Sequence, residues 1–294
     1  MADEKTAFLF PGQGRLPDRF PVDSDVTERL LRVAEGAGLA LQALLEEKDA
    51  DRLTQTEFTQ PILLIDSLAR NERLRSAGWT PNIAAGHSLG EYAALVCAGS
   101  LDAEDALRIV IERGRLMSDV RGGMTAILKL PLETVRSLCE AVGKGVCVAN
   151  RNAPTQVVVS GEPAALEEVA SRAIEAGGRA IPLRVSGPFH SPAMLGAQRA
   201  LEASIINAPL SAPRFPVVSG VTGSAESNPT RLRELLCRQM TAPVQWVGVV
   251  THMKAAGVTR AIEVGSGDVL TRLGRQIHPE IRFITYQEAI DEGI

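Results

Sequence analysis

Short apolar runs alternate with longer amphipathic stretches in the first part of the chain. The apolar runs at 6–10 and 82–85 each lead into a glycine-containing turn, which is typical of buried strands. Between them, 27–50 and 61–77 have the spacing of helices, and the second of these begins at a proline and stops at Gly78. This order of strand, helix, strand, helix predicts a parallel α/β sheet.

The middle of the chain has a different pattern and is flanked by glycines. Its expected elements are, in order, a strand at 124–130, a helix at 132–142, strands at 145–149 and 156–159, a helix at 163–176 and a strand at 179–185. The order β-α-β-β-α-β is the ferredoxin-like pattern. We therefore expect 122–187 to be a small domain inserted into a larger α/β domain made of 1–121 and 188–294.

The last part of the chain returns to the α/β pattern. Its expected elements are a strand at 216–219, helices at 231–240 and 247–256, and a strand at 260–264. Gly265-Ser266-Gly267 follows this strand but lacks the third glycine of a dinucleotide-binding loop, so a nucleotide cofactor has little support.

Composition narrows the function classes. Of the 294 residues, 45% are hydrophobic and 22% charged, which excludes a disordered chain and a disulfide-rich scaffold. Aromatic residues make up only 4%, too few for a base-stacking platform, and the net charge of −4 disfavours a polyanion bound through an overall positive field. We expect no nucleic-acid partner.

The cysteines and the hydropathy indicate a compartment. No cysteine forms a C-x-x-C pair or has a histidine at metal-ligand spacing, so we expect reduced thiols and no metal. No apolar stretch approaches the roughly 18 residues of a membrane span, and the first residues do not resemble a signal peptide. We expect a cytoplasmic protein without a membrane partner. The four cysteines are Cys97, Cys139, Cys147 and Cys237.

Residues 86–90 read Gly-His-Ser-Leu-Gly and lie between an expected strand and an expected helix at 91–98. In this context Ser88 is a candidate nucleophile, exposed on a sharp turn at a helix N-terminus. Backbone N–H groups there, and that of Gln13 between two glycines after the first strand, are candidate donors to an oxyanion. A serine that only caps the helix is the alternative.

A serine nucleophile needs a base, and the chain offers four histidines. His87 adjoins the serine and would point elsewhere, His252 lies in an expected helix, and His278 lies near the C-terminal end. His190 lies in the irregular loop where the inserted domain ends, which makes it the best-placed base. A loop histidine with a structural hydrogen bond is the alternative.

Arg113 lies within the apolar stripe of a helix expected to follow Asp102. Its neighbours at helical spacing are Ile109, Val110, Leu116 and Met117. A buried guanidinium must find an anion or reach water. The candidates are an internal salt bridge and a bidentate site for a substrate carboxylate.

These residues resemble those of the malonyl-CoA:acyl carrier protein acyltransferases of fatty-acid and polyketide synthesis. The resemblance covers almost the whole chain, and the order of its motifs is specific. They are FPGQG at 10–14, TQP at 59–61, GHSLGEY at 86–92, ERG at 112–114, QVVVSG at 156–161, GPFHS at 187–191, PVQW at 243–246 and EVG at 263–265. The resemblance implies a hydrolase-like α/β domain that carries the ferredoxin-like insertion.

The resemblance also implies residue roles. Ser88 would be the acylated nucleophile, His190 its base without an acidic third member, and Arg113 the group that holds the malonyl carboxylate. The other implied roles are backbone oxyanion donors at Gln13 and Leu89, a carbonyl that orients the histidine at Gln239, contacts near the CoA arm at Asn150 and Asn152, and a malonyl-selective Phe189. The CoA thioester would be a substrate, so no cofactor is expected.

One segment departs from the family pattern. After Gly-Gln-Gly the family continues with Ser-Gln and soon after with Gly-Met, whereas this chain continues with a shortened segment that begins Arg-Leu-Pro-Asp-Arg at 15–19. The departure affects the rim of the cleft and the carrier contact rather than the dyad.

Three functions fit these residues. The first is a monomeric ping-pong transferase that moves malonyl from CoA to the pantetheine thiol of an acyl carrier protein, in fatty-acid synthesis, in trans on a polyketide line, or on the carrier of a malonate decarboxylase. The second is a thioesterase or esterase with the same dyad, and the third is an inactive docking subunit. An arginine on an apolar face favours the first.

The acidic carrier expected for this family would dock on a local basic patch, because the chain is net negative. The candidate residues are Arg70, Arg73, Arg75, Arg151 and Lys254.

Overall fold

The structure of the protein is a computed structural model that describes residues 4–14, 16–17, 24–47 and 50–293. Positions 15, 18 and 19 of the shortened segment therefore lie outside the described residues.

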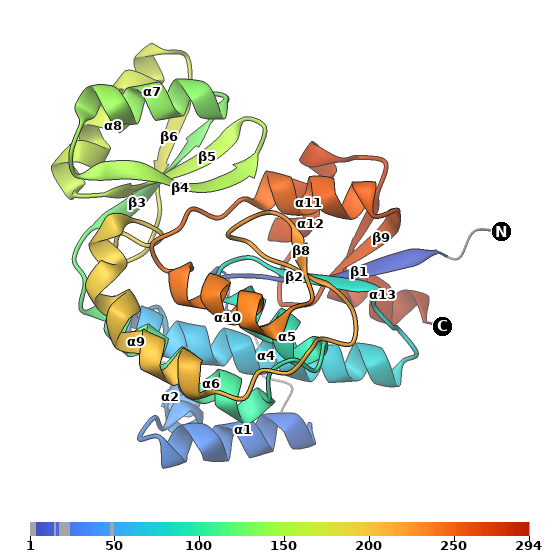
Figure 1. The fold of residues 1–294 in the computed structure, drawn as a ribbon. Helices are drawn as coiled ribbons and strands as arrows, with labels where there is room; N and C mark the ends of the chain where they lie inside the picture. The colour runs from blue at the N-terminus through green and yellow to red at the C-terminus, as the bar shows by residue number, and fades with distance from the viewer. Residues whose placement is uncertain (1–3, 15, 18–23, 48–49, 294) are drawn as a thin grey trace.

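The larger of two sheets forms the centre of the molecule (Figure 1). Its strand order is β10-β9-β1-β2-β7-β8, and all neighbouring pairs are parallel except β7 with β8. The strands are β1 (Lys5–Phe10), β2 (Ile83–Gly86), β7 (Val217–Val218), β8 (Ala225–Glu226), β9 (Val258–Glu263) and β10 (Arg282–Thr285). Phe10 of β1 pairs with Gly86 of β2, so the turns that follow these strands meet at one sheet edge.

Helices cover both faces of this sheet and bury its apolar residues (Figure 1). The helices on the early part of the chain are α1 (Asp25–Gly36), α2 (Leu41–Glu47), α3 (Ala50–Leu53), α4 (Thr56–Ser76), α5 (Gly90–Cys97) and α6 (Ala103–Ser118). Those on the later part are α9 (Leu195–Asn207), preceded by a short 3-10 turn at Pro192–Met194, α10 (Pro229–Arg238), α11 (Trp246–Ala255), α12 (Val269–Ile277) and α13 (Tyr286–Glu292). As expected, Asp102 caps α6, with its carboxylate accepting from the Glu104 N–H at 2.8 Å.

A second, four-stranded sheet stands apart from the first (Figure 1). Its order is β4-β5-β3-β6, and each neighbouring pair is antiparallel. Two helices cover the face that points away from the larger sheet (Figure 1). The elements are β3 (Gly123–Leu128), α7 (Leu132–Val142), β4 (Val146–Ala153), β5 (Gln156–Gly161), α8 (Pro163–Glu175) and β6 (Arg179–Pro182). The predicted parallel sheet and the expected order of elements in the middle of the chain are both observed.

Three predicted elements differ from the structure. The helix expected to begin at Pro61 begins at Thr56, and Pro61 lies inside it. The helix expected over 27–50 is interrupted after α1, where Gly38 has a φ of 75°. The residues expected to separate two strands at 150–153 belong to β4, which has register shifts there against β5.

Several elements were not predicted, among them α9, α12 and β10. Within the described residues, no helix combines the length and the apolar character needed to cross a bilayer.

Candidate active site

Ser88 lies on a sharp turn between β2 and α5. Its φ is 51°, a left-handed conformation that is strained for a residue other than glycine. The flanking glycines are required by close backbone contacts. A Cβ on Gly86 would lie 1.9 Å from the carbonyl carbon of Gly90, and a Cβ on Gly90 would lie 2.0 Å from the Phe10 carbonyl oxygen. The turn therefore holds Ser88 at the helix N-terminus, with Gly90 packed directly against the end of β1.

His190 is brought to this serine from 102 residues along the chain. Its Nε2 lies 2.7 Å from Ser88 Oγ, and its own φ of 57° is also left-handed. Its Nδ1 lies 3.1 Å from two carbonyl oxygens, those of Gln239 and Ala242. Since carbonyls only accept, Nδ1 carries the hydrogen and Nε2 is free to accept the serine proton.

The surroundings keep this imidazole neutral. Burial, followed by the charge of Arg113 and the neighbouring His87, lowers the pKa of His190 to about 3. The two carbonyl contacts oppose this shift but do not cancel it. At neutral pH His190 is therefore a neutral acceptor for the Ser88 hydroxyl.

Arg113, on α6, is 1% exposed and aims its guanidinium at the serine. It donates to the Gln60 side-chain oxygen at 2.5 Å, to Ser88 Oγ at 3.2 Å and to the Gln239 side-chain oxygen at 3.3 Å. All three acceptors are neutral oxygens. An internal salt bridge, the alternative left open by the sequence, is thus not among these contacts. The guanidinium also interacts electrostatically with the buried carboxyl of Glu91, although the two do not form a salt bridge within the described residues.

Gln239 connects this cation to a buried carboxyl. Its amide nitrogen donates to Glu91 Oε2 at 2.8 Å and to the Ser88 carbonyl at 3.1 Å. Burial raises the pKa of Glu91, opposed by its hydrogen bonds to Gln239, Ser219 and the Gly220 backbone and then by the charge of Arg113. Gln239 thus contacts His190 through its backbone carbonyl and Arg113 through its side-chain oxygen.

Two backbone N–H groups are available near Ser88. Those of Gln13 and Leu89 have no backbone acceptor within the part of the chain that the structure describes. Leu89 is the residue after the serine, and Gln13 lies in the turn after β1, which is adjacent because β1 pairs with β2. Their place beside Ser88 makes both N–H groups candidate donors to an oxyanion.

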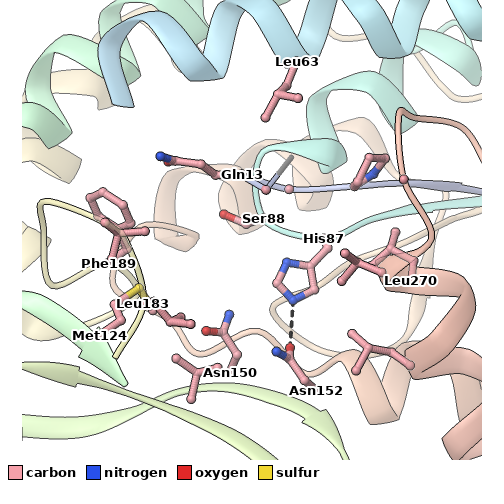
Figure 2. Close-up of a pocket in the computed structure, with 18 of the residues that line it drawn as sticks. Gln13, Leu63, His87, Ser88, Met124, Asn150, Asn152, Leu183, Phe189 and Leu270 are labelled. Carbon is pink, nitrogen blue, oxygen red and sulfur yellow. Dashed lines mark hydrogen bonds between the residues drawn. The ribbon is translucent and has the colours of Figure 1, made fainter. Parts of the chain in front are cut away.

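A pocket opens beside Ser88, between α4 and the second sheet (Figure 2). Its lining includes the predicted residues Asn150, Asn152 and Phe189. The walls are otherwise mainly apolar, with Leu63, Met124, Val158, Leu183, Val185, Val269, Leu270 and Leu273 among the lining residues. The pocket is thus mainly apolar beside the serine, with polar groups both on the second sheet and at the end of β9, where Glu263 and Ser266 line it.

His87 faces the polar groups on the second sheet rather than the serine. Its Nε2 lies 2.9 Å from Asn152 Oδ1 (Figure 2), and its ring packs against Trp246 at a centroid distance of 5.4 Å. Burial lowers its pKa. The expectation that His87 points away from Ser88 agrees with this placement.

Two of the basic docking candidates are already paired. Arg70 donates to both carboxylate oxygens of Asp66 at 2.9 Å, and Lys254 lies 3.5 Å from Glu280. Arg151 lies between two pocket-lining residues of β4, Asn150 and Asn152. Its backbone therefore adjoins the pocket lining, although Arg151 itself is not a lining residue.

Sequence reasoning gave no role to several groups around the serine. Gln60 and Thr56 form a hydrogen-bonded chain beside Arg113, and Glu91 contacts Gln239. The Thr-Gln-Pro motif at 59–61 pointed to Gln60. Because the predicted helix began at Pro61, however, the sequence did not indicate that Gln60 and Thr56 lie one turn apart on the same helix. Within the described residues, no group of three or more His, Cys, Asp or Glu side chains is arranged to hold a metal ion.

Comparisons with known proteins agree with this geometry. The profile of the acyl transferase domain family matches residues 8–281. The malonyl CoA-acyl carrier protein transacylase of Escherichia coli strain K12 is 39% identical over 284 residues, which cover 92% of each chain. The family resemblance predicted from the sequence is confirmed.

Two further relatives come from polyketide synthesis. The polyketide biosynthesis protein ThaF of Burkholderia thailandensis is 41% identical over 93% of this chain, which spans only 24% of ThaF. A solved complex, PlMCAT:AntF, contains a type II PKS acyl-carrier protein and its malonyl-transacylase. It matches this chain with a TM-score of 0.92 and 33% identity over 99% of this chain and 100% of that one.

Proposed function

Because the chain belongs to the acyl transferase domain family, we propose that it transfers a malonyl group from malonyl-CoA to the phosphopantetheine thiol of an acyl carrier protein. The observation that carries this proposal is the buried Arg113 guanidinium, 3.2 Å from Ser88 Oγ, whose three hydrogen-bond acceptors within the described residues are all neutral oxygens. A carboxylate on the acyl group would supply a directly bound anion, which none of these three hydrogen bonds provides.

The first half-reaction forms an acyl-enzyme. Ser88 Oγ attacks the thioester carbonyl carbon while His190 Nε2 takes the hydroxyl proton. The carbonyl oxygen becomes an oxyanion next to the Gln13 and Leu89 N–H groups. The carbon–sulfur bond then breaks, and the CoA sulfur leaves with the proton held by His190.

The second half-reaction reverses these roles. The carrier's thiol gives its proton to His190 as its sulfur attacks the carbonyl carbon of the malonyl-serine ester. The ester bond breaks, and Ser88 Oγ recovers the proton. The Gln239 and Ala242 carbonyls hold Nδ1–H in both steps, so they take the orienting place that an acidic third residue has in a triad.

The remaining predicted site residues have supporting positions. Asn150, Asn152 and Phe189 line the pocket that leads to Ser88, as contacts to the pantetheine arm and acyl group require. The thioester is a substrate, and we assign no cofactor.

A thioesterase or esterase with the same dyad is the main alternative. Such an enzyme passes the acyl group to water and needs no buried cation beside its nucleophile. An inactive docking subunit is the other alternative, and it gives no reason for two strained residues to meet at hydrogen-bond distance. The relatives include both a malonyl CoA-acyl carrier protein transacylase and polyketide proteins, which support a fatty-acid or a polyketide carrier. The carrier of a malonate decarboxylase stays an expectation from the sequence.

We propose that this site lies between two domains. Residues 122–187 would be a ferredoxin-like insertion, and 1–121 with 188–294 a hydrolase-like domain. The strand order β4-β5-β3-β6 with two helices on one face supports the first assignment. The serine turn between a parallel strand and a helix supports the second. A monomeric state and a cytoplasmic location stay predictions, and the four free cysteines agree with a reducing compartment.

The proposed function is tested by incubating the protein with malonyl-CoA, acetyl-CoA and larger acyl-CoAs, each with a panel of phosphopantetheinylated carriers. We expect malonyl to appear on a carrier thiol faster than any uncharged acyl group. Release of free malonate at the same rate without a carrier would instead identify a thioesterase.

A further inference from the structure

The hydroxyl of Thr56 lies between two parts of the proposed catalytic site, the Gln60–Arg113 pair and the turn that contains Gln13. It is in the first turn of α4, and the residue is 1% exposed. Its Oγ1 lies 2.8 Å from Gln60 Nε2 and 2.9 Å from Gln13 Oε1. Gln60 in turn accepts from Arg113 at 2.5 Å. A continuous chain of hydrogen bonds therefore runs from the guanidinium to the turn that holds a proposed oxyanion donor.

The direction of this chain is fixed by its arginine end. A guanidinium only donates, so Gln60 must turn its oxygen to Arg113 and its amide nitrogen to Thr56. The threonine oxygen then accepts from Gln60, and its single hydrogen is left for the Gln13 side-chain oxygen. Gln60 Nε2 also lies 3.3 Å from Met117 Sδ. An amide turned the other way would bring its nitrogen against the guanidinium, so that two donors faced each other.

Helix packing makes the chain rigid. Thr56 and Gln60 are four residues apart on α4 and so share one face. A Cβ on Gly114 of α6 would lie 2.9 Å from the Glu57 Cα, which shows how closely the two helices approach. This approach brings Arg113, the residue before Gly114, within reach of Gln60.

We propose that Thr56 is a positioning residue that ties the Gln13 turn to Arg113, so that the oxyanion donor and the carboxylate-binding group are held in one frame. The inference rests on the proposed function, because it concerns how the oxyanion donor and Arg113 are held in position relative to each other. Thr56 acts through Gln13 and Gln60 and does not contact the acyl group itself.

The test is the rate constant of Ser88 acylation, measured as CoA release in a single turnover with saturating malonyl-CoA or acetyl-CoA. Thr56→Val keeps the shape of the side chain but removes the hydroxyl, and Thr56→Ser keeps the hydroxyl. Thr59→Val is the matched control. Thr59 is buried on the same helix turn, and within the described residues its hydroxyl bonds the Leu53 and Gln55 carbonyls and no other group.

We expect Thr56→Val to lower the acylation rate constant about tenfold to a hundredfold for both acyl groups, because a misplaced oxyanion donor affects both. The malonyl-CoA rate should fall further, because Gln60 also loses an acceptor. Thr56→Ser should restore most of the rate, and Thr59→Val should leave it within a factor of about two. In an Arg113→Ala background, Thr56→Val should no longer change the ratio of malonyl to acetyl rates.

Two results with the Thr56 variants would overturn the inference. One is a Thr56→Val protein that acylates as fast as Thr59→Val, and the other is a lowered rate that Thr56→Ser does not restore. If Thr56→Val does not fold, Gln13→Leu removes the same hydrogen bond from the other end and should lower both rates in the same way. Unchanged rates in that variant also reject the inference. A wild-type protein that malonyl-CoA does not acylate would reject the proposed function instead.

Discussion

His190 Nε2 and Ser88 Oγ lie 2.7 Å apart, and both residues have left-handed backbones, with φ values of 57° and 51°. Neither residue is glycine, so each conformation costs free energy that the surrounding packing must offset. The glycines beside the serine and the carbonyls behind the histidine provide that support. The dyad is therefore held by tight backbone contacts rather than by a third charged side chain.

The close contacts of Gly90 give a stability prediction. Gly90→Ala places a methyl group 2.0 Å from the Phe10 carbonyl oxygen, so β1 or the serine turn must move. We expect the free energy of unfolding to fall by about 1–3 kcal/mol or more. Gly196→Ala is the control, because a Cβ there meets no atom within 4 Å and the residue lies in α9. Urea denaturation that gives both variants the same stability would contradict the packing argument.

Arg113→Ala should change acyl selectivity. A charge-assisted bidentate contact is worth about 1.5–3 kcal/mol, so kcat/KM for malonyl-CoA should fall by roughly tenfold to a hundredfold or more. Acetyl-CoA has no carboxylate to lose and should be spared or improved. Arg108→Ala, on the exposed side of the same helix, should leave both values unchanged. An equal fall for both substrates would mean that Arg113 has only a structural role.

The neutral state of His190 gives a prediction about pH. An ordinary histidine takes up a proton as the pH falls through about 6.5 and then stops acting as a base. The pKa of His190 is lowered to about 3, mainly by burial and then by the charge of Arg113 and the neighbouring His87. We therefore expect kcat/KM for acetyl-CoA to show no inflection near pH 6.5.

The nearby Glu91, whose pKa burial raises, is the group that could add its own inflection to this profile. Glu91→Gln removes that group, so it separates the two residues. If kcat/KM for acetyl-CoA still falls below pH 6.5 in the Glu91→Gln variant, His190 titrates like an exposed histidine, which would contradict the prediction.

The position of Arg151 predicts a salt-sensitive step with the carrier. It adjoins two residues that line the pocket, whereas Arg75 lies at the C-terminal end of α4, twelve residues beyond the pocket residue Leu63. Arg151→Ala should raise KM for the carrier and weaken its dependence on ionic strength, and Arg75→Ala should do neither. Carrier transfer that does not respond to salt in the wild type would contradict electrostatic docking.

The sequence predicted those elements whose pattern is local. The strand that ends at Phe10, the serine turn and the helix capped by Asp102 all depend on neighbouring residues, and each was found where expected. Pro61 was misleading because proline favours the first turn of a helix, so the sequence predicted a helix that begins there. In the structure residues 56–60 pack against α6 and extend the helix upstream of the proline.

The polar residues of β4 show a second limit. Asn150 and Asn152 look like a loop because they suit turns, yet 150 pairs with both β5 and Val244 and is buried. Tertiary contacts override the local preference there. The chain from Arg113 to Gln13 could not be predicted for a similar reason, since it depends on how two helices and a turn meet.

The central claim is that Ser88 carries the malonyl group between its two thioesters. The most direct test is intact-protein mass spectrometry after mixing with malonyl-CoA, followed by peptide mapping and then by addition of a phosphopantetheinylated carrier. We expect one malonyl group per chain on Ser88, none on the Ser88→Ala variant, and its loss when the carrier gains it. Persistent labelling of Ser88→Ala, or a label that the carrier does not remove, would contradict the account.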